Sequence, residues 1–432
     1  MQVELIAPAS AASAPLPRLG LGLLAAMTPA TDEVVYTDEV VRPFDLSRDV
    51  KDVDLVGISV DSKTAHRSYA IADAYRRRGV PVVLGGIHPT ACPEEALAHA
   101  DAVVAGEGEG AWPEVLEAAR RRALCGVFRP EPPSLADLPV PPRRRLFCSW
   151  KYIPCDVVQT MRGCPYPCEF CSVSTHNGTT MRFRPADEVL AELAGVGRLV
   201  LFADDNVMIH RAHARDLFGR MGALGRQWIG QCSLAAVRRL ENVQLMAASG
   251  CKALFVGFES IDEATTRHAG KRQNRPAEYR ETIARLHDHG IAVWGSFVFG
   301  FDTDDPEVFD RTVEFALNAR LTLATFAMLC PYPGTALHRR LAAEGRLTDP
   351  CWWLRADEER AAPHYRPARM TREQLREGWL RAWQRFYGWR GMWSRFGALD
   401  RGWLRSAGFW PVNLVQHAQT RRKVAAEASP VP

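Results

Sequence analysis

The sequence contains no run of about 18 apolar residues, the length that an α-helix needs to span a bilayer, although 47% of its 432 residues are hydrophobic. It also lacks the signature of a secretory signal peptide, because MQVELIAPAS has no basic flank before its apolar residues. Eleven cysteines without such a signal favour a reducing compartment. We therefore expect a cytoplasmic protein of two or three domains with an ample core.

The sequence also lacks a large excess of charge of either sign, since its net charge is only +4. The positive excess belongs to the tail, where 15 Lys and Arg residues stand against 7 Asp and Glu residues from Cys351 onward. A short basic run, Arg143 to Arg145, follows several prolines. Three charges in that setting are more typical of a solvated or interdomain segment than of a nucleic-acid site. The sequence therefore predicts no nucleic-acid partner.

A fourth cysteine is missing from the most informative motif, MRGCPYPCEFCSV, which places Cys164, Cys168 and Cys171 in CxxxCxxC spacing after a predicted strand. Most 4Fe-4S clusters have four cysteine ligands, so three leave one iron free to bind a small molecule. Buried free thiols or a zinc site are the alternatives, but zinc sites more often use paired CxxC or Cys/His spacings. We expect a 4Fe-4S cluster whose open iron is the reactive position.

The same spacing, with Phe170 just before the last cysteine, resembles the signature of the radical S-adenosylmethionine (SAM) enzymes. In that family the open iron chelates the amino and carboxylate groups of SAM. An electron from the cluster then cleaves SAM to a 5′-deoxyadenosyl radical. The resemblance also implies an electron donor such as flavodoxin or ferredoxin.

Residues 1–125 alternate short apolar runs with helical periodicity. Five strands are predicted at VELIAP, EVVYTDE, DLVGISV, VPVVLGG and AVVAGEG, with helices between them such as Ser68 to Arg78 and Glu94 to His99. This alternation predicts an α/β, Rossmann-like, doubly wound parallel sheet, which binds ligands at the carboxyl ends of its strands. Glycines there either let a ligand approach the backbone or simply form turns. The candidate residues in these loops are Ser59, Gly85, Gly86, His88, Gly106, Glu107 and Gly108.

The strings GGIHPTACPEEAL and ADAVVAGEGEGAWPEVLEA resemble the cobalamin-binding domain at the amino end of many radical SAM enzymes. The resemblance implies that the loops named above hold cobalamin. The DxHxxG motif, whose histidine binds cobalt in many cobalamin proteins, is missing, and the pair Asp61 and His66 has the wrong spacing. We therefore expect cobalamin without a protein histidine on cobalt, and His88 beside the corrin or its tail.

Residues 126–155 are rich in proline and arginine and predict a stiff linker. In residues 156–350 six strands are predicted at DVVQTMRG, RLVLFADD, WIGQCSL, ALFVGFES, AVWGSFVFG and LATFAMLCPYP, separated by five helical stretches. Six such units predict a partial (β/α)6 barrel with its active site at the carboxyl ends of the strands. The cysteine motif and the polar residues of interest all follow strand ends.

The resemblance also implies where SAM is bound. The phenylalanine of the cysteine motif would pack near the adenine, and the loop after the second strand would meet the amino group. That loop reads ADDN, where the family often has GGE. Aspartates before a helix can equally serve as its cap, so the role of Asp205 stays open between these two interpretations. The SAM contacts implied by the resemblance are Phe170, Asp204, Asp205, Ser233, Glu259 and Ser260.

The predicted helical C-terminal region, residues 351–432, contains 8 of the 12 tryptophans. Apolar residues recur there at three- and four-residue spacing with arginines opposite, which predicts an amphipathic helix. Basic helices of this kind can lie on membranes, but such a stripe more often packs on its own domain, and we favour that interpretation. The stripe consists of Leu375, Trp379, Trp383, Phe386, Trp389, Trp393 and Phe396.

These features together predict a cobalamin-dependent radical SAM enzyme that methylates an unactivated carbon, or a phosphinate phosphorus, of a small-molecule or secondary-metabolite intermediate. Within the resemblance, the alternative is a non-methylating enzyme that cyclises, oxidises or rearranges a ring. From a different class, the chain could be a sensor that holds cobalamin and a cluster without turnover. A complete cysteine triad followed by GFES favours an enzyme.

Overall fold

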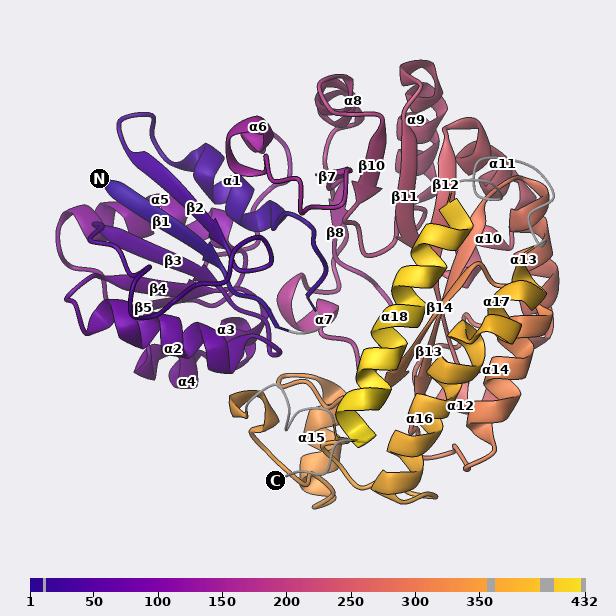
Figure 1. The fold of residues 1–432 in the computed structure, drawn as a ribbon. Coiled ribbons are helices and arrows are strands. Elements are labelled where there is room, and N and C mark those ends of the chain that lie inside the picture. Colours follow the sequence, from indigo (N-terminus) through magenta and orange to yellow (C-terminus); the bar gives the residue numbers. More distant parts are fainter. Residues whose placement is uncertain (11–12, 356–361, 397–407, 429–432) are drawn as a thin grey trace.

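The structure is a computed structural model that describes residues 1–10, 13–355, 362–396 and 408–428. Two parallel sheets stand next to each other, one in the N-terminal domain and one in the barrel, and short helix α7 lies between them (Figure 1). The C-terminal helices cover the side of the barrel near its last strand. Within the described ranges, no helix is both long and apolar enough to cross a membrane.

The N-terminal domain is a six-stranded parallel sheet in the order β2-β1-β3-β4-β5-β6. Its strands are β1 (Gln2–Ala7), β2 (Glu33–Asp38), β3 (Leu55–Ser59), β4 (Val82–Gly85), β5 (Ala102–Val104) and β6 (Gly126–Phe128). Its helices are α1 (Leu19–Met27), α2 (Ala65–Arg76), α3 (Ile87–Ala91), α4 (Pro93–Ala98) and α5 (Gly108–Arg120). The central strands read as nearly continuous apolar runs because helices cover both faces.

The five strands expected in this domain are confirmed, and β6 is an addition. It pairs with β5 and extends the sheet three residues beyond 125, into the segment predicted as linker. The three residues GVF are too short a run to be recognised before a proline-rich segment. The linker itself contains α6 (Arg143–Leu146).

The second sheet is parallel and open, in the order β14-β13-β12-β11-β10-β7, which confirms a partial barrel. Its strands are β7 (Asp156–Val158), β10 (Leu199–Phe202), β11 (Gln227–Cys232), β12 (Cys251–Glu259), β13 (Ala292–Phe299) and β14 (Leu323–Met328). The helices around it are α7 (Val173–His176), α8 (Ala186–Ala194), α9 (Arg211–Met221), α10 (Leu234–Val237), α11 (Leu240–Ala248), α12 (Glu263–His268), α13 (Tyr279–Asp288), α14 (Val308–Asn318) and α15 (Ala336–Ala343).

The first barrel strand, predicted at DVVQTMRG, is divided into β7 and a second short strand, β8 (Met161–Arg162), and the short strand β9 (Arg182–Phe183) was not predicted. Strands β8 and β9 are antiparallel. They pair directly with each other and close the loop of residues 163–181, which contains the three motif cysteines. Gly163 opens this loop with φ +93°, and a side chain there would come within 2.3 Å of the Thr180 carbonyl oxygen. The base of the cysteine loop therefore requires glycine at this position.

The C-terminal helices α16 (Arg372–Tyr387), α17 (Trp389–Arg395) and α18 (Phe409–Ala428) follow the barrel. The indoles of Trp379 and Trp383 both donate to the carbonyl oxygen of Phe326 in β14, at 2.8 and 2.9 Å. The Tyr387 hydroxyl donates to the Ala324 carbonyl at 2.7 Å and accepts from its amide at 3.1 Å. These bonds satisfy backbone groups on the free edge of β14, which would otherwise attract other strands.

The predicted packing of the aromatic stripe on its own domain is thus confirmed for α16. It is only partial for the continuation, because Trp389 and Trp393 are 54% and 63% exposed although their rings contact His417 and Trp410 of α18. Gly388 has extended backbone angles and separates α16 from α17, so the stripe does not continue along one straight helix.

A buried arginine fastens these helices to the start of β14. Arg395 is 1% exposed, and its guanidinium donates to the carbonyl oxygens of Leu321, Thr322 and Phe386 at 2.9–3.0 Å and to the Asn413 side chain at 3.1 Å. Burial lowers its pKa to about 10, so the group stays charged at neutral pH.

Replacing Arg395 by methionine should lower the free energy of unfolding by about 3 kcal/mol, because several buried carbonyl groups lose a charged donor. The measurement is urea denaturation followed by circular dichroism. Arg390→Met is the matched control, since Arg390 is an exposed arginine of the same helix and should shift stability by no more than about 0.5 kcal/mol. Equal stability of the two variants would contradict this role.

Candidate active site

The three motif cysteines lie on the loop between β8 and β9, and contacts from α15 hold this loop in place. The amide of Leu337 donates to the Glu169 carbonyl at 2.8 Å. The guanidinium of Arg340 binds the Glu169 carboxylate through two nitrogens at 3.0 and 3.1 Å, and also contacts Asp302 at 2.7 Å. A planar, forked contact of this kind fixes orientation as well as position. Glu169 stands between Cys168 and Phe170, so the loop is pinned at its centre.

An ion pair lies beside these cysteines. Glu259 ends β12 with φ +62° and is 7% exposed, and Lys271 Nζ contacts its carboxylate at 2.6 Å. Gly270, the residue before Lys271, packs closely on the cysteine loop. A side chain at this position would lie 2.5 Å from the Pro167 carbonyl oxygen. Burial lowers the pKa of Lys271, but the nearby negative groups outweigh burial and raise it to about 12. The ammonium is therefore a stable cation at the cysteine loop.

The three thiols respond to their surroundings in the same way. Burial raises the pKa of Cys164, Cys168 and Cys171, and the positive charge of Lys271 opposes that effect at each of them. Cluster thiolates carry negative charge, so a fixed ammonium at this place favours them.

The chemistry of these residues fits a 4Fe-4S cluster, because three thiols lie on one loop and a buried ammonium group stands beside that loop. Within the part of the chain that the structure describes, no group of three or more His, Cys, Asp or Glu side chains converges as ligands of one metal ion would. Cysteines of a cluster bind different irons and need not converge on one point. Cys164, Cys168 and Cys171 would hold the cluster, and Lys271 would balance its charge.

Two of the predicted SAM residues have side chains available for a ligand. Phe170 lies edge to face with Phe301, which follows β13, at 5.9 Å between ring centres. Ser233 follows β11, and its buried hydroxyl has no hydrogen-bond partner among the described residues. Its amide donates to the Asn206 side chain at 3.1 Å. Because buried hydroxyls are normally paired, Ser233 fits a position where a bound ligand completes the hydrogen bonding.

Asp204 has a different role from the one predicted. It is 3% exposed, and its carboxylate accepts from the amides of Thr160 and Met161 at 2.6 and 3.2 Å and from the Thr160 hydroxyl. Burial raises its pKa to about 6. These contacts lie between the end of β7 and the start of β8, so Asp204 supports the start of the cysteine loop, and both of its oxygens already accept hydrogen bonds from the protein.

The remaining predicted SAM residues also have protein partners. Asp205 accepts from the Asn177 side chain at 3.2 Å, and the Ser260 hydroxyl accepts from the Asp262 amide at 3.1 Å. Neither aspartate of the ADDN loop caps the next helix, because His210 is the N-cap of α9. The capping interpretation is therefore wrong, and Asp205 remains the loop's candidate for the SAM amino group.

In the N-terminal domain, the predicted loops meet at one edge of the sheet. Ser59 and Gly85 are register partners at the ends of β3 and β4. Gly86 and Gly106 follow β4 and β5 with φ +113° and +135°, values that favour glycine. The hydroxyl of Thr90 joins these two loops, because it donates to the Gly86 carbonyl at 2.7 Å and accepts from the Gly106 amide at 3.0 Å.

His88 has no free ring nitrogen for cobalt. It is 0% exposed, with Nδ1 at 3.1 Å from the Ser62 hydroxyl and Nε2 at 3.0 Å from the Glu95 carboxylate. The same carboxylate accepts from the Trp353 indole at 3.0 Å. Trp353 belongs to the short helix η3 (Trp352–Leu354). His88 therefore supports the contact between the N-terminal domain and the C-terminal region.

Glu107 likewise has protein partners, although it stands between Gly106 and Gly108 in the predicted cobalamin loop. Its carboxylate accepts from Arg162 and Arg182 of the barrel domain. A second link joins Thr90 to His176 of α7, with 3.2 Å between Oγ1 and Nδ1. Helix α3 also packs on α7. The structure thus brings the glycine loops of the first domain against the cysteine loop of the second.

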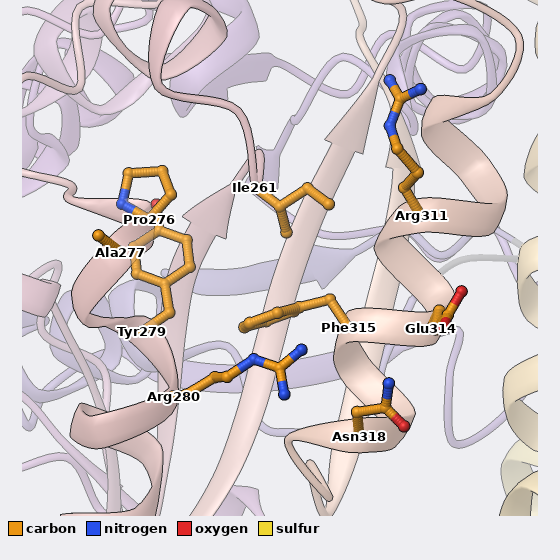
Figure 2. A pocket seen from close by; sticks show the side chains of 9 residues that line it. All are labelled: Ile261, Pro276, Ala277, Tyr279, Arg280, Arg311, Glu314, Phe315 and Asn318. Atoms are coloured by element: carbon orange, nitrogen blue, oxygen red, sulfur yellow. The ribbon is translucent and has the colours of Figure 1, made fainter.

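Two cavities lie away from these loops. One, of about 390 Å³, lies between α13 and α14, and its lining includes Tyr279, Arg280, Arg311 and Phe315 (Figure 2). The other, of about 760 Å³, lies between the linker and α8. Neither is lined by a motif cysteine or by a predicted SAM or cobalamin residue, so neither bears on the site.

Known families match the chain in the order that the fold suggests. A B12 binding domain matches residues 9–116, and the Radical SAM superfamily matches residues 158–316. The chain thus combines a B12 binding domain with a radical SAM domain. A domain family of unknown function matches residues 335–405.

The curated relatives of this chain include proteins named as methyltransferases and proteins named as cyclases. Bacteriochlorophyllide d C-12(1)-methyltransferase of Chlorobaculum tepidum is 28% identical, and the match covers 98% of this chain and 92% of that protein. The anaerobic magnesium-protoporphyrin IX monomethyl ester cyclase of Cereibacter sphaeroides is 26% identical over 71% of this chain and 55% of that one. The solved structure of OxsB with aqua-cobalamin and SAM has a TM-score of 0.69 at 13% identity, over 98% of this chain and 71% of that chain, which shows the fold alone.

Two residues beside the cysteine loop were missed by the sequence reasoning. Lys271 lies in HAGKRQN and Arg182 in NGTTMRFRP, after the GFES strand and the cysteine motif respectively. A lysine between glycine and arginine gives no sign that it faces a cysteine loop about 100 residues earlier. Only the fold brings the two together.

Proposed function

We propose that this protein is a cobalamin-dependent radical SAM methyltransferase that acts on a carbon atom of a small molecule. Its cofactors are a 4Fe-4S cluster, SAM and cobalamin. The observation that carries the proposal is the meeting of two candidate cofactor loops, since the glycine loops of the B12 domain contact the cysteine loop through Thr90 and His176. A radical source and a methyl source then face one substrate space.

The family comparison favours methyl transfer over ring formation. The methyltransferase relative is matched over 92% of its length and the cyclase over 55%. The finer statements are an unactivated carbon or a phosphinate phosphorus as the acceptor, a secondary-metabolite intermediate as the substrate, and flavodoxin or ferredoxin as the electron donor. They rest on the sequence resemblance alone.

The chain's own residues have three roles in this proposal. Cys164, Cys168 and Cys171 hold the cluster and leave one iron open. When bound, SAM and the cluster supply a carbon radical, and cobalamin supplies a methyl group. Phe170 and Ser233 would contact SAM, and Asp205 would accept a hydrogen bond from its amino group. Lys271 would offer the donors that Glu259 does not use. The protein thereby positions the reactants and excludes water.

The stoichiometry of SAM use tests methyl transfer. Each methylation should consume one SAM as radical source and a second as methyl source, so 5′-deoxyadenosine and S-adenosylhomocysteine should form in about equal amounts. The measurement is to incubate the reduced, cobalamin-loaded protein with candidate substrates and SAM labelled on its methyl group, then to quantify both products and follow the label. The cyclase or oxidase alternative would be favoured if deoxyadenosine forms in a substrate-dependent way while no S-adenosylhomocysteine forms and no labelled methyl group reaches the substrate. A sensor would make neither product.

A further inference from the structure

The contact between the two domains contains a group of buried charges that the predicted chemistry does not use. Glu107 and Glu109 of the B12 domain are 4% and 8% exposed, and Arg162 of the barrel domain is 6% exposed. Arg162 contacts both carboxylates, with 2.6 Å to Glu109. Arg182 binds Glu107 through two nitrogens and also donates to the Pro133 carbonyl of the linker at 2.8 Å.

The two arginines are neighbours across a strand pair. Arg162 in β8 is the register partner of Arg182 in β9. Like charges directly opposite each other destabilise an antiparallel ladder. The carboxylate of Glu107 contacts both guanidinium groups and removes that repulsion. The closure of this ladder therefore depends on a residue of the other domain.

The ladder of β8 and β9 lies at the base of the cysteine loop. Residues 163–181, which include all three motif cysteines, lie between Arg162 and Arg182, so the ladder is the base of the cysteine loop. Glu107 stands between Gly106 and Gly108, in the loop after β5 that faces the barrel. A single carboxylate thus connects the B12 domain's glycine loop to both ends of the cysteine loop. Thr90 and His176 form a second, neutral connection between the same loops.

We propose that Glu107 is a positioning residue that fixes the separation of the cluster from cobalamin by closing the base of the cysteine loop on the B12 domain. This inference rests on the proposed function, since both cofactors must reach one substrate. If the Glu107 carboxylate is lost, the three cysteines can still bind the cluster. Their loop, however, is no longer held at a fixed distance from the glycine loop of the B12 domain. SAM cleavage then continues without matched methyl transfer.

A matched ion pair elsewhere separates this role from simple stabilisation. Glu192 in α8 also lies buried between two arginines, Arg143 and Arg184, and its side chain is 2% exposed against 3% for Glu107. Its partners connect α8 with the linker and with the residues just before β8, because Arg143 and Arg184 also donate to the carbonyl oxygens of Val157 and Gln159. They have no contact with Glu107 or the other residues of the B12 domain's glycine loops among these bonds, so the pair lies near the ladder without joining it to the B12 domain. Glu107→Gln and Glu192→Gln should therefore lose similar stability, but only the first should change the cofactor arrangement.

The first measurement needs no cofactor. Hydrogen exchange of residues 163–181 in the full-length protein should become about tenfold faster in Glu107→Gln, because the loop base opens more often. It should stay near the wild-type rate in Glu192→Gln. Equal exchange in both variants would overturn the proposal. Arg182→Lys keeps the charge but loses the forked contact, and the same increase is expected there if Glu107→Gln does not fold.

The second measurement uses protein reconstituted with both cofactors. The magnetic coupling between cob(II)alamin and the reduced cluster, observed by electron paramagnetic resonance, should spread over a range of distances in Glu107→Gln and keep one value in Glu192→Gln. The ratio of deoxyadenosine to S-adenosylhomocysteine should rise by about tenfold or more only in Glu107→Gln, because misplacement by about 1 Å already costs much of the rate. An unchanged coupling and ratio in Glu107→Gln would refute the positioning role. If the wild-type protein forms no S-adenosylhomocysteine, the proposed function fails. The hydrogen exchange of residues 163–181 and the magnetic coupling between cob(II)alamin and the cluster still test the positioning role in that case.

Discussion

Replacing Cys164, Cys168 and Cys171 together by alanine should abolish both iron incorporation and SAM cleavage. The reconstituted wild-type protein should hold about four irons, and the variant none of the cluster, because the three thiolates are its protein ligands. Without the cluster no electron reaches SAM, so deoxyadenosine should fall to the background of the reductant alone. The measurements are iron and sulfide content and product formation under anaerobic conditions.

The chain offers a matched control for this experiment. Cys125, Cys148 and Cys351 are exposed and lie outside the motif. Their joint replacement by alanine should leave iron content and SAM cleavage near wild-type values, and it also tests whether the loss of any three thiols impairs reconstitution. SAM cleavage by the motif variant at the control's rate would disprove the cluster assignment.

Replacing Lys271 by methionine should lower the rate of SAM cleavage by about 10²-fold or more, because a preorganised charge inside a site is worth about that much. The ammonium acts on all three motif thiols and carries donors beyond the one that Glu259 accepts. Its removal takes a cation away from the cluster and leaves Glu259 buried without its partner. The measurements are deoxyadenosine formation, iron content and the reduction potential of the cluster, which should become more negative.

Two further variants separate the charge of Lys271 from the stability of a buried ion pair. Lys271→Arg keeps the positive charge and should retain more activity than Lys271→Met. In the N-terminal domain, Lys51 contacts Glu4, whose side chain is 0% exposed. Lys51→Met therefore breaks a similar lysine–glutamate pair away from the barrel and should leave the cluster potential unchanged. A Lys271→Met protein with wild-type potential and SAM cleavage within a few-fold of wild type would contradict the assigned role.

The positions of the catalytic loops followed from the sequence because they depend on short-range patterns. Apolar runs alternating with helical segments predicted both parallel sheets, and ligands of such sheets gather at the carboxyl ends of strands. The cysteine spacing identified Cys164, Cys168 and Cys171 without any three-dimensional information, since all three lie on one loop. The short strands β6 and β9 were missed, and β8 was predicted as the end of β7, because two or three residues carry no periodicity.

The roles of individual polar side chains did not follow from the sequence. His88, Glu107 and Asp204 stand at the expected places, at strand ends among glycines or before helices. In the structure their nitrogen and oxygen atoms bind protein groups, namely Glu95 and Ser62, Arg162 and Arg182, and Thr160 and Met161. Apart from Glu95, which is 7 residues from His88, these partners are 26 to 75 residues away in the sequence.

The sequence by itself determined the two-sheet architecture, the cysteine loop and the family, because these depend on local spacing and on apolar periodicity. Only the tertiary structure decided which of the polar residues remain available to cofactors and which fasten the domains together. The physical reason is that a buried charge must be paired, and its partner is chosen by the packing of elements that are far apart in the chain. Glu107 is the clearest case: its neighbours in sequence are glycines of a ligand loop, and its partners in space are two arginines at the base of the cysteine loop.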